Sequence, residues 1–558
     1  MNLLSKFLNR TDFSDYDDFR RNAKLCVPSD FNFGFDVVDE YARLCPEKRA
    51  LVWCNQKGEE KVVTFGEMKE LSLKMCNVIS SYGVKKGDFV MSMLNRRWEY
   101  WVLVVACCKM GVVLIPATHM LTPKDVAYRV NEAGVKLLFA TEEEDVAEHI
   151  SLALPDCKNL KGVLSVNGAH FDNLDEKLEN APAEFSFDAR PNPRDLMLVY
   201  FTSGTTGMPK MVMHDFLYPL GHVFTAKYWQ DVVDDGLHFT MAETGWAKCS
   251  WGKIYGQWIS GTAVFAYDYH GRFTPTDVLP LVKKYGITTF CAPPTIYRFL
   301  VKEDLSSFDL SSIKHCSTAG ESLNPEVFKQ FEKATGLKIY EGFGQTEGTV
   351  MLGTFKYLSP VTGSLGKPSP LYDVRLIDDD ENEVKPGEEG EIAILKSENQ
   401  CGLVAGYFKD EARTAALKND VYFHTGDLAY QDKDGWFWYV GRKDDIIKSS
   451  GYRIGPFEVE SALMEHPAVL ECAITAVPDD LRGQIVKATI VLTKNYQPSD
   501  ALVKELQNHV KKVTAPYKYP RIVEFVKELP KTTSGKIRRV EIRENDKNNF
   551  LVRFPKTP

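Results

Sequence analysis

The chain has 558 residues, and two or more domains are expected at that length, because single hydrophobic cores stop growing at about 250–300 residues. Apolar residues make up 44% of the chain and charged residues 26%, as in an ordinary globular protein. The 76 acidic and 68 basic side chains give a net charge of −8, which argues against a dedicated nucleic-acid binder.

The 12 cysteines form no C-x-x-C pair and show no spacing typical of a metal site. Cys107 and Cys108 are adjacent within an apolar run, so we expect buried free thiols, which suit a reducing cytosol. The most apolar stretch, 101–116, contains Lys109 and Gly111 and is too short to span a membrane. The N-terminus becomes acidic too early for a signal or transit peptide, so we expect a cytoplasmic protein.

Strand-like apolar runs alternate with amphipathic helical stretches through residues 30–430, which predicts an α/β fold. From 364 to 440 the sequence is richer in turns and short strands, which predicts a β-rich subdomain. The clearest expected strands before that segment are 89–94, 135–140, 196–202, 288–292 and 337–340.

Charge and glycine become concentrated near Arg442, and we place a domain boundary at 443–445. The chain then divides into an N-terminal domain, 1–443, and a small C-terminal α/β domain, 444–558. In the second domain, Pro456 is expected to begin a helix, because proline fits the first helical turn. Two strands and an amphipathic helix follow, at 471–477, at 487–493 and around Leu502, Leu506, Val510 and Val513.

A loop at 200–210, with the sequence YFTSGTTGMPK, follows an apolar strand and combines small residues, hydroxyls and a lysine. Small residues let backbone N–H groups close around an anion, hydroxyls donate further hydrogen bonds, and Lys210 adds a positive charge. This is not a Walker A loop, because Pro209 precedes the lysine and Met211 follows it. The pattern therefore predicts a phosphate site of another kind.

A second motif, EGFGQTE at 341–347, follows the strand expected at 337–340. It therefore lies at the carboxyl end of a strand, where open α/β sheets place their ligands. An aromatic ring there can stack on a purine, Thr346 can bind a phosphate, and Glu347 can hold Mg²⁺ through oxygen ligation. Thr-Gly-Asp at 425–427 is a weaker motif, in which a carboxylate on a tight turn can accept hydrogen bonds from ribose hydroxyls.

Five motifs, in this order, resemble those of the adenylate-forming superfamily of acyl-CoA synthetases, luciferases and peptide-synthetase adenylation domains. They lie at 200–210, 341–347, 424–427, 441–460 and 530–539. The string TAPYKYPR, 514–521, resembles the medium-chain acyl-CoA synthetase subgroup in particular. Many members have Tyr where this chain has Phe343, so stacking is kept there and a hydroxyl is lost.

The resemblance implies that the protein binds MgATP. Thr205 and Thr206 would hold the β- and γ-phosphates, and Glu347 would hold the Mg²⁺. The implied catalytic residues are Lys536, Thr346 and Arg453, with Lys536 neutralising charge between the attacking carboxylate and the α-phosphate. The implied ATP-binding residues are Thr202, Ser203, Gly204, Thr205, Thr206, Gly207, Lys210, Glu341, Gly342, Phe343, Gly344, Gln345, Thr346, Asp427, Arg442 and Lys536.

The resemblance also implies a mobile C-terminal domain that turns about Asp444 and binds coenzyme A. Gly451 matches a loop that lines the pantetheine tunnel, where its missing Cβ leaves room for the thiol chain. Coenzyme A carries a 3′-phosphate and a diphosphate, so the basic residues of this domain are reasonable partners. The implied CoA-binding residues are Ser450, Gly451, Tyr452, Arg482, Tyr519, Pro520 and Arg521.

The acyl pocket of the superfamily draws on two segments, which are 243–258 and 317–322 in this chain. Trp246 and Trp251, if both face the pocket, would block a long straight channel and favour a short, branched or ring-shaped acid; core positions for them are equally open. Lys248 would be costly there without a partner, so it pairs with an acid, reaches the substrate carboxylate or points away. The implied pocket residues are Trp246, Lys248, Trp251, Ala319 and Gly320.

These observations predict an AMP-forming ligase that activates a short- to medium-chain fatty acid, straight or branched, and transfers it to coenzyme A. An aromatic acid, and transfer to a carrier-protein thiol or to oxygen, remain open. A non-catalytic nucleotide sensor would have lost Lys536, Glu347 or Asp427, and all three are present. The sequence leaves the choice between monomer and homodimer open.

Overall fold

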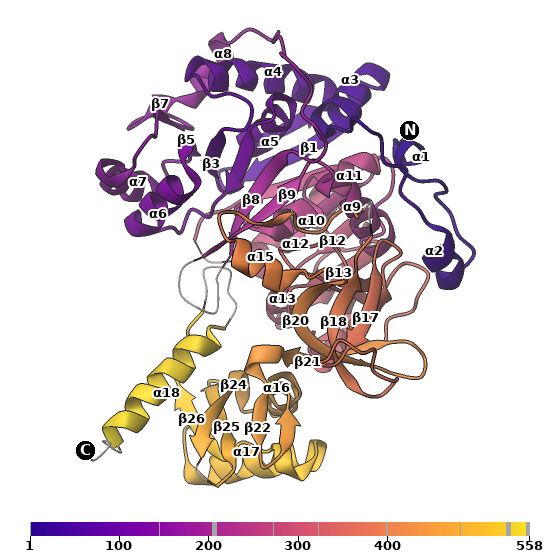
Figure 1. Ribbon diagram of the computed structural model, residues 1–558, viewed down its shortest axis with the longest axis vertical. Helices are drawn as coiled ribbons and strands as arrows, with labels where there is room; N and C mark the ends of the chain where they lie inside the picture. The colour runs from indigo at the N-terminus through magenta and orange to yellow at the C-terminus, as the bar shows by residue number, and fades with distance from the viewer. Residues whose placement is uncertain are drawn as a thin grey trace.

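The structure is a computed structural model that describes residues 2–143, 145–202, 209–271, 273–321, 323–397, 400–479, 481–531 and 537–553. Within them lie four β-sheets, and Figure 1 shows the last one with its helices as a separate unit beyond β21. The predicted α/β class, with a β-rich subdomain and a small C-terminal unit, is confirmed.

An eight-stranded sheet of the described residues has the order β19-β9-β8-β4-β3-β5-β6-β7. Its strands β3, β4, β5, β6 and β8 are parallel, and β9 returns antiparallel to β8. The bounds are β3 Phe89–Met93, β4 Val113–Pro116, β5 Val135–Ala140, β6 Gly162–Ser165, β7 Asp172–Asn173, β8 Leu196–Thr202, β9 Lys210–Asp215 and β19 Gly406–Tyr407.

A nine-stranded sheet of the described residues has the order β16-β15-β14-β13-β12-β10-β11-β1-β2. Its central strands β14, β13, β12, β10, β11 and β1 are parallel, so their carboxyl ends meet at one edge. The bounds are β1 Arg49–Asn55, β2 Glu60–Thr64, β10 Leu237–Thr240, β11 Ala263–Asp268, β12 Thr289–Cys291, β13 His315–Ala319, β14 Ile339–Phe343, β15 Leu352–Gly353 and β16 Lys367–Pro368.

Two antiparallel-rich sheets follow. The β-rich subdomain contains β17 Asp373–Ile377, β18 Glu389–Leu395, β20 Tyr422–Gln431 and β21 Phe437–Arg442. The C-terminal sheet contains β22 Ile447–Ser449, β23 Tyr452–Ile454, β24 Val469–Asp479, β25 Gly483–Leu492 and β26 Ile522–Val526. A short 3₁₀ turn, η5 Lys443–Asp445, joins them at the boundary expected from the sequence.

The helices pack on these sheets. Those of the first 300 residues are α1 Leu4–Phe7, α2 Tyr16–Asn22, α3 Glu40–Leu44, α4 Phe65–Ser81, α5 Glu99–Met110, α6 Pro123–Ala133, α7 Val146–Ala153, α8 Leu174–Asn180, α9 Tyr218–Phe224, the π-helical turn η3 Thr225–Trp229, α10 Ala247–Gly252, α11 Tyr255–Ile259, α12 Pro275–Tyr285 and α13 Pro294–Leu300. They are followed by α14 Pro325–Thr335, α15 Glu411–Leu417, α16 Pro456–Met464, α17 Asp500–Val513 and α18 Arg539–Arg553.

The local sequence explains where several helices begin and end. Before α6, the Thr122 side chain accepts a hydrogen bond from Asp125 N, Pro123 occupies the first turn, and Gly134 ends the helix at φ 71°. Pro456 begins α16 in the same way, as predicted. Ser499 caps α17, whose side chains Leu502, Leu506 and Val510 are buried.

Helix α5 explains the apolar run that the sequence placed between Trp101 and Pro116. It is buried on all sides within the core that the two large sheets share, as expected for a helix without a polar face. Lys109 lies in this core because its Nζ is 2.6 Å from Asp39 Oδ1 and donates to Ser72 Oγ at 2.9 Å. No helix of the described residues is long and apolar enough to cross a membrane.

The C-terminal sheet has a hydrophobic core of its own. Its buried members run from Ile447 to Val510 and include Ile474, Ile490 and Leu506, and Phe525 packs against them. This core is distinct from the clusters under the two large sheets.

Several sequence-based boundaries need correction. Strand β3 ends at Met93 rather than 94, and β12 is limited to Thr289–Cys291. Strand β14 runs Ile339–Phe343 instead of 337–340, so the first three residues of EGFGQTE lie in the strand itself. Val513 was expected on the buried face of α17 but is 46% exposed, because it is the last residue of the helix.

Candidate active site

The first motif lies in the connection between β8 and β9. Thr202 ends β8, Lys210 begins β9, and the two are register partners across the antiparallel pair. Lys210 Nζ lies 5.2 Å from the centre of the Tyr407 ring on β19. The other predicted residues of this loop, Ser203, Gly204, Thr205, Thr206 and Gly207, lie outside the described residues.

Glycine is required in the second motif by close packing. A Cβ on Gly342 would lie 2.5 Å from the Trp229 ring, and a Cβ on Gly344 would overlap the Trp251 ring. Phe343 packs near Tyr439 of β21, with ring centroids 6.4 Å apart. The indole rings of Trp229 and Trp251 therefore pack directly against the backbone of the predicted nucleotide motif.

The carboxylate of Asp427 joins three of the predicted motifs. It accepts hydrogen bonds from Gln345 Nε2, from Arg442 Nη1 at 3.1 Å and from the Tyr439 hydroxyl at 2.9 Å. Asp427 and Arg442 face each other across β20 and β21. The structure thus brings Gln345, Asp427 and Arg442 together, as the sequence predicted for one nucleotide site.

The carboxylate of Glu347 is oriented by a tyrosine that the sequence did not single out. The Tyr407 hydroxyl donates to Glu347 Oε1 at 2.9 Å, while its ring lies under the Lys210 ammonium. Glu347 is half-buried, and a half-buried, oriented carboxylate is a suitable oxygen ligand for Mg²⁺. The donor set at this position therefore fits the predicted metal.

His214 on β9 is a second residue that the sequence analysis missed. Its Nε2 donates to the Thr346 carbonyl at 2.7 Å, and its ring stacks on Tyr218 with centroids 3.9 Å apart. Burial lowers the pKa of His214 to about 4, so the ring is neutral near pH 7. The histidine therefore fixes the backbone of Thr346. The signal available in the sequence was the dipeptide His214-Asp215, directly after the apolar residues 211–213.

Glu341 is buried in the middle of β14. Burial raises the pKa of its carboxyl to about 8, against the hydrogen bond that it accepts from Leu323 N at 3.2 Å. The Glu341 side chain is therefore mostly protonated at neutral pH.

The predicted acyl residues lie on α10 and at the end of β13. Lys248 Nζ donates to the Ala319 carbonyl at 2.9 Å, a backbone partner that the sequence analysis had not considered. A Cβ on Gly320, at φ 102°, would lie 2.7 Å from that ammonium. Trp251 is buried edge-on against Trp229, with centroids 5.9 Å apart, and Trp246 caps α10 and is half-buried.

Cys249 is not arranged as a nucleophile. Its side chain is buried, and burial raises the pKa of the thiol to about 12. Burial likewise raises the pKa of Cys108 to about 12, and Cys107 is buried beside it, so these two are free buried thiols as predicted.

The predicted CoA loop forms the tight hairpin between β22 and β23. Ser450 and Gly451 have φ values of 50° and 84°, so both central residues are left-handed, as in a type I′ turn. Gly451 is exposed, with no heavy atom within 4 Å of an added Cβ. Tyr452 stacks on Tyr517 with centroids 4.1 Å apart, and Tyr519 accepts a hydrogen bond from Arg521 at 2.7 Å.

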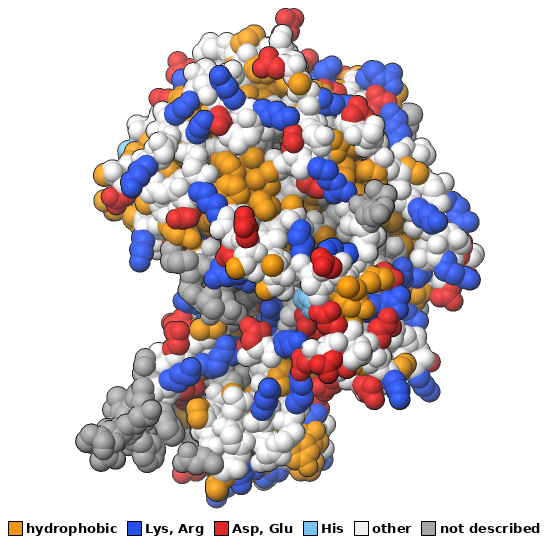
Figure 2. All heavy atoms as spheres, viewed as in Figure 1, with side chains coloured by type: hydrophobic (Ala, Val, Ile, Leu, Met, Phe, Trp, Pro, Cys, Tyr) orange, Lys and Arg blue, Asp and Glu red, His pale blue; other side chains and the backbone are white. Residues whose placement is uncertain are grey.

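Arg453, Arg482 and Asp444, the predicted hinge residue, lie at the surface. Arg453 Nη1 is 3.9 Å from Asp379, Arg482 Nη1 is 3.7 Å from Asp479, and Asp444 Oδ1 is 3.8 Å from Arg442 Nε. Figure 2 shows acidic side chains gathered over β17 and β18 next to the C-terminal unit, where the exposed turn 378–380 lies. In this arrangement Arg453 pairs with that acidic turn.

Lys536 lies outside the described residues, but Arg539, three residues later, has defined contacts. Arg539 begins α18 and forms three hydrogen bonds with Glu460 of α16, at 2.7, 2.8 and 3.2 Å. Glu460 also accepts from Ile474 N at 2.8 Å. The chain is therefore anchored to the C-terminal core three residues after the predicted catalytic lysine.

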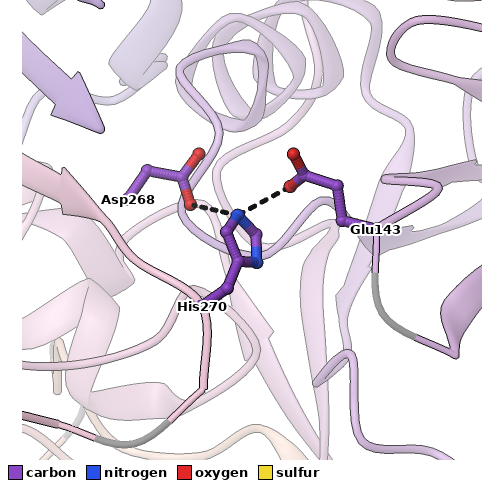
Figure 3. A group of neighbouring side chains, drawn as sticks. All are labelled: Glu143, Asp268 and His270. Atoms are coloured by element: carbon purple, nitrogen blue, oxygen red, sulfur yellow. Dashed lines mark ion pairs between the residues drawn. The ribbon is translucent and has the colours of Figure 1, made fainter. Parts of the chain in front are cut away.

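One group of described side chains has the spacing of a metal site. Figure 3 shows His270 between Asp268 and Glu143, and its Nε2 lies 2.8 Å from Glu143 Oε2 and 3.9 Å from Asp268 Oδ1. Glu143 follows β5 and Asp268 ends β11, so the group joins the two large sheets. Arg97 Nη1 lies 3.7 Å from Asp268 and supplies positive charge there, so we interpret the group as an ion-pair network.

Comparison with known proteins places this site in a family. The chain matches the AMP-binding enzyme family over residues 38–408 and the AMP-binding enzyme C-terminal domain over residues 458–536. It is 42% identical over 548 residues to the mitochondrial acyl-coenzyme A synthetase ACSM3 of Mus musculus, covering 96% of this chain and 94% of that protein. It is 42% identical over 537 residues to the mitochondrial acyl-coenzyme A synthetase ACSM5 of Homo sapiens, covering 94% and 92%.

Solved structures agree in fold. The anthranilate CoA ligase AuaEII, in complex with anthranoyl-AMP, superposes with a TM-score of 0.85 at 26% identity, over 94% of this chain and 99% of that one. A benzoate CoA ligase from Burkholderia xenovorans LB400 gives a TM-score of 0.81 at 24% identity, over 92% and 100%, and supports the fold. The nucleotide motifs, the family matches and the fold agree, and the chain belongs to the AMP-binding enzyme family.

Proposed function

We propose that this protein is an AMP-forming acyl-CoA synthetase, which activates a carboxylic acid with MgATP and transfers the acyl group to coenzyme A. The observation that carries the proposal is the convergence of Gln345, Arg442 and Tyr439 on Asp427, close to Thr346 and Glu347, in a chain of the AMP-binding family. The names of the relatives, which are acyl-coenzyme A synthetases, support it.

In the first step, an oxygen of the substrate carboxylate attacks the α-phosphorus of ATP, and pyrophosphate leaves. Lys536 neutralises the charge that builds between the two, and Thr346, whose carbonyl His214 holds, presents its hydroxyl to the phosphate. Asp427 and Arg442 would hold the ribose, and Phe343 would stack on the purine. Glu347 would hold the Mg²⁺, whose charge would screen that of the triphosphate.

In the second step, the CoA sulfur attacks the acyl carbonyl, and AMP leaves. We propose the domain division 1–443 and 444–558, with the C-terminal domain turning about Asp444 between the two steps. The turn removes Lys536 and brings Gly451 to the adenylate, so one domain serves two half-reactions. Ser450, Tyr452, Arg482, Tyr519, Pro520 and Arg521 are the proposed CoA contacts.

The acid is proposed to be a short- to medium-chain fatty acid. Trp251 is packed between Trp229 and the backbone of Gly344, and such a ring limits the length of any adjacent channel. The anthranilate CoA ligase that shares the fold acts on an aromatic acid, so aromatic acids belong in the test as the alternative.

Cellular location and assembly are part of the proposal. The sequence favours the cytoplasm, whereas the ACSM relatives are named mitochondrial, and free cysteines such as Cys107 and Cys108 suit both reducing compartments. Fractionation of cells that carry a tagged chain separates the two locations. Analytical ultracentrifugation of the purified protein decides between a monomer and a homodimer.

The test of the function is AMP release across a panel of acids, with and without coenzyme A. Acetate, isobutyrate, hexanoate, octanoate and benzoate cover length, branching and aromaticity. We expect AMP release that needs both coenzyme A and a short- to medium-chain acid. Pyrophosphate exchange without CoA-dependent AMP release would instead support a carrier-protein acceptor, and the absence of both reactions would contradict the proposal.

A further inference from the structure

A row of polar side chains crosses the nine-stranded sheet below the residues predicted to line the acyl pocket. Thr240 on β10 pairs with Cys291 on β12, and Cys291 pairs with Ser317 on β13. Register partners on neighbouring strands point to the same face, and Ala319, two residues beyond Ser317, shares that face. Since a strand rises about 3.3 Å per residue, the row lies about 7 Å deeper than Ala319.

This face of the sheet is covered by the elements that carry the predicted pocket. Ala319 is the register partner of Gly342, whose missing Cβ leaves space for Trp229 of η3. Gly252 of α10 packs in the same way on the Thr240 side chain. The row therefore faces η3 and the tryptophan-bearing helix α10.

Gln230, the residue after Trp229, is oriented by a neighbour. Its Oε1 accepts a hydrogen bond from Gln257 Nε2 at 2.6 Å, and the same amide donates to the Trp251 carbonyl at 3.0 Å. Because Gln257 donates to the side-chain oxygen of Gln230, the Nε2 group of Gln230 needs an acceptor from another residue or a ligand. Among the described residues, Gln230 Nε2 and Ser317 Oγ are buried and have no hydrogen-bond partner other than the weak contact with the Cys291 thiol.

These groups surround the thiol of Cys291. Burial raises the pKa of that thiol, and the side chain of Ser317, the charge of Lys248 and the side chains of Gln230 and Thr240 oppose the rise. A thiol is only a weak hydrogen-bonding group, so this contact does not satisfy a buried amide and a buried hydroxyl. Buried polar groups left in this state are costly and call for a partner.

We propose that the row binds an oxygen atom on the tail of the acyl substrate, so that the preferred acids are oxo or hydroxy acids. The oxygen would accept from Gln230 Nε2 and bond to Ser317 Oγ, whereas a hydrocarbon tail would leave both groups unpaired. The inference rests on the proposed function and names the class of its substrate.

The experiment uses acids of five to seven carbons that carry an oxo, a hydroxyl or a methyl group on the penultimate carbon. These groups have similar size, so they differ mainly in hydrogen bonding. We measure kcat/KM for CoA-dependent AMP release and expect at least one oxygenated acid to exceed its methyl partner by about tenfold or more.

Two variants test whether the row causes the preference for oxygenated acids. Gln230→Leu and Ser317→Ala should each reduce the ratio of oxygenated to methyl acid, while the methyl acids are turned over as well or better. Ser260→Ala is the matched control, because its hydroxyl is also buried without a partner among the described residues but lies at the end of α11, outside the row. It should leave the ratio unchanged.

Three outcomes overturn the inference. The first is that the parent protein turns over the methyl acids as fast as the oxygenated acids, or faster. This result needs no variant and would mean that the row binds only water. The second is a preference that survives both row variants. Failure of every acid to release AMP overturns the proposed function together with the inference, whereas turnover without a preference overturns the inference alone.

Discussion

At the scale of single residues, Asp427 is the point at which the proposed nucleotide site is already ordered without ATP. Its carboxylate is bonded by Gln345 from the second motif, by Arg442 from β21 and by the Tyr439 hydroxyl. Hydrogen bonds to a charged group are about twice as strong as neutral ones, so this carboxylate fixes the relative position of three segments. A ribose would meet an ordered acceptor.

We predict that Asp427→Asn raises the KM for ATP by about 10- to 100-fold, because it removes the charge from a carboxylate that three side chains bond. The KM for the acid should change little, since the acid lies elsewhere. Steady-state kinetics with each substrate varied in turn measures the difference. Asp434→Asn, in the exposed turn before β21, is the control, and an equal rise in both KM values would contradict the assignment.

Glu341 predicts a pH dependence of stability. The pKa of its buried carboxyl is about 8 in the folded protein against a model value of 4.5, so the folded state holds a proton that the unfolded state releases. The stabilising effect is therefore complete below about pH 4.5 and is lost as the pH rises to 8, by at most about 5 kcal/mol.

Glu341→Gln should remove this decline, because an amide does not titrate. We expect the variant to gain stability relative to the parent as the pH rises from 5 to about 8, measured by denaturant unfolding of the ligand-free protein. Glu326→Gln, at an exposed position of α14, controls for the loss of one negative charge. Parallel pH profiles for Glu341→Gln and the parent would rule out the buried carboxyl as the cause.

The sequence assigned Asp427, Arg442 and Gln345 to one nucleotide site but did not predict that they bond to one another. Motif order along the chain was enough to assign Asp427 and Arg442 to one site, since they lie on consecutive strands. His214 and Tyr407 were missed because each bonds to a residue far away in the sequence, and Tyr439 was missed because it belongs to no motif. The partner of Lys248 was also missed, because it is a backbone carbonyl, which every residue has, so the sequence does not indicate it.

At the scale of elements, the junction of α16 and α18 anchors the chain at Arg539, three residues after Lys536. Glu460 and Arg539 form a two-point ion pair, and Glu460 also accepts from the backbone of β24. Burial raises the pKa of Glu460, and Arg539 opposes this by keeping the carboxylate charged. Breaking such a buried pair from one side leaves an uncompensated charge and costs about 3–5 kcal/mol.

We predict that Arg539→Ala lowers the thermal stability of the C-terminal unit and slows adenylation, measured as pyrophosphate exchange. Thioester formation from preformed acyl adenylate should be affected less, because it does not use Lys536. The matched control is Arg538→Ala, which removes a largely exposed ion pair with Glu541 worth about 1 kcal/mol or less. Equal effects of the two variants would show that the buried pair does not position the segment.

The elements themselves were largely predictable, because hydrophobic periodicity reports burial. Strands β5 and β8 were predicted with their observed ends, and the turn η5 lies at the boundary that a change in composition indicated. The ends of β14 and α17 were not. Phe343 extends β14 through pairing with β15, which only the folded sheet provides, and Val513 follows the helical spacing but lies at the helix end.

At the scale of the whole molecule, the C-terminal unit has features that fit the proposed movement as a body. It has its own hydrophobic core, and a short 3₁₀ turn connects it to β21. Asp444 lies in that turn half-exposed, 3.8 Å from Arg442, so reorienting it breaks only a long ion pair. The polar row from Thr240 to Ser317 could not have been predicted, because it depends on the register of three strands that are distant in sequence.

Domain alternation predicts that the two half-reactions can be separated by variants in the C-terminal half of the chain. Lys536→Ala should slow adenylation by about 100- to 1000-fold, the usual cost of losing one group that stabilises transition-state charge. It should leave thioester formation from preformed acyl adenylate nearly unchanged. Asp444→Pro should do the reverse, because proline fixes the φ angle of the hinge and restricts the turn to one orientation.

Rapid-quench measurements of acyl-adenylate formation and of its consumption by coenzyme A give the two rates for each variant. Lys443→Ala serves as the hinge control: it removes a neighbouring ion pair, 2.9 Å from Asp379, without restricting the backbone. It should change both rates little. A change of orientation lets each residue matter in only one half-reaction. If Lys536→Ala slowed both half-reactions, or if Asp444→Pro slowed both equally, one domain orientation would serve both steps.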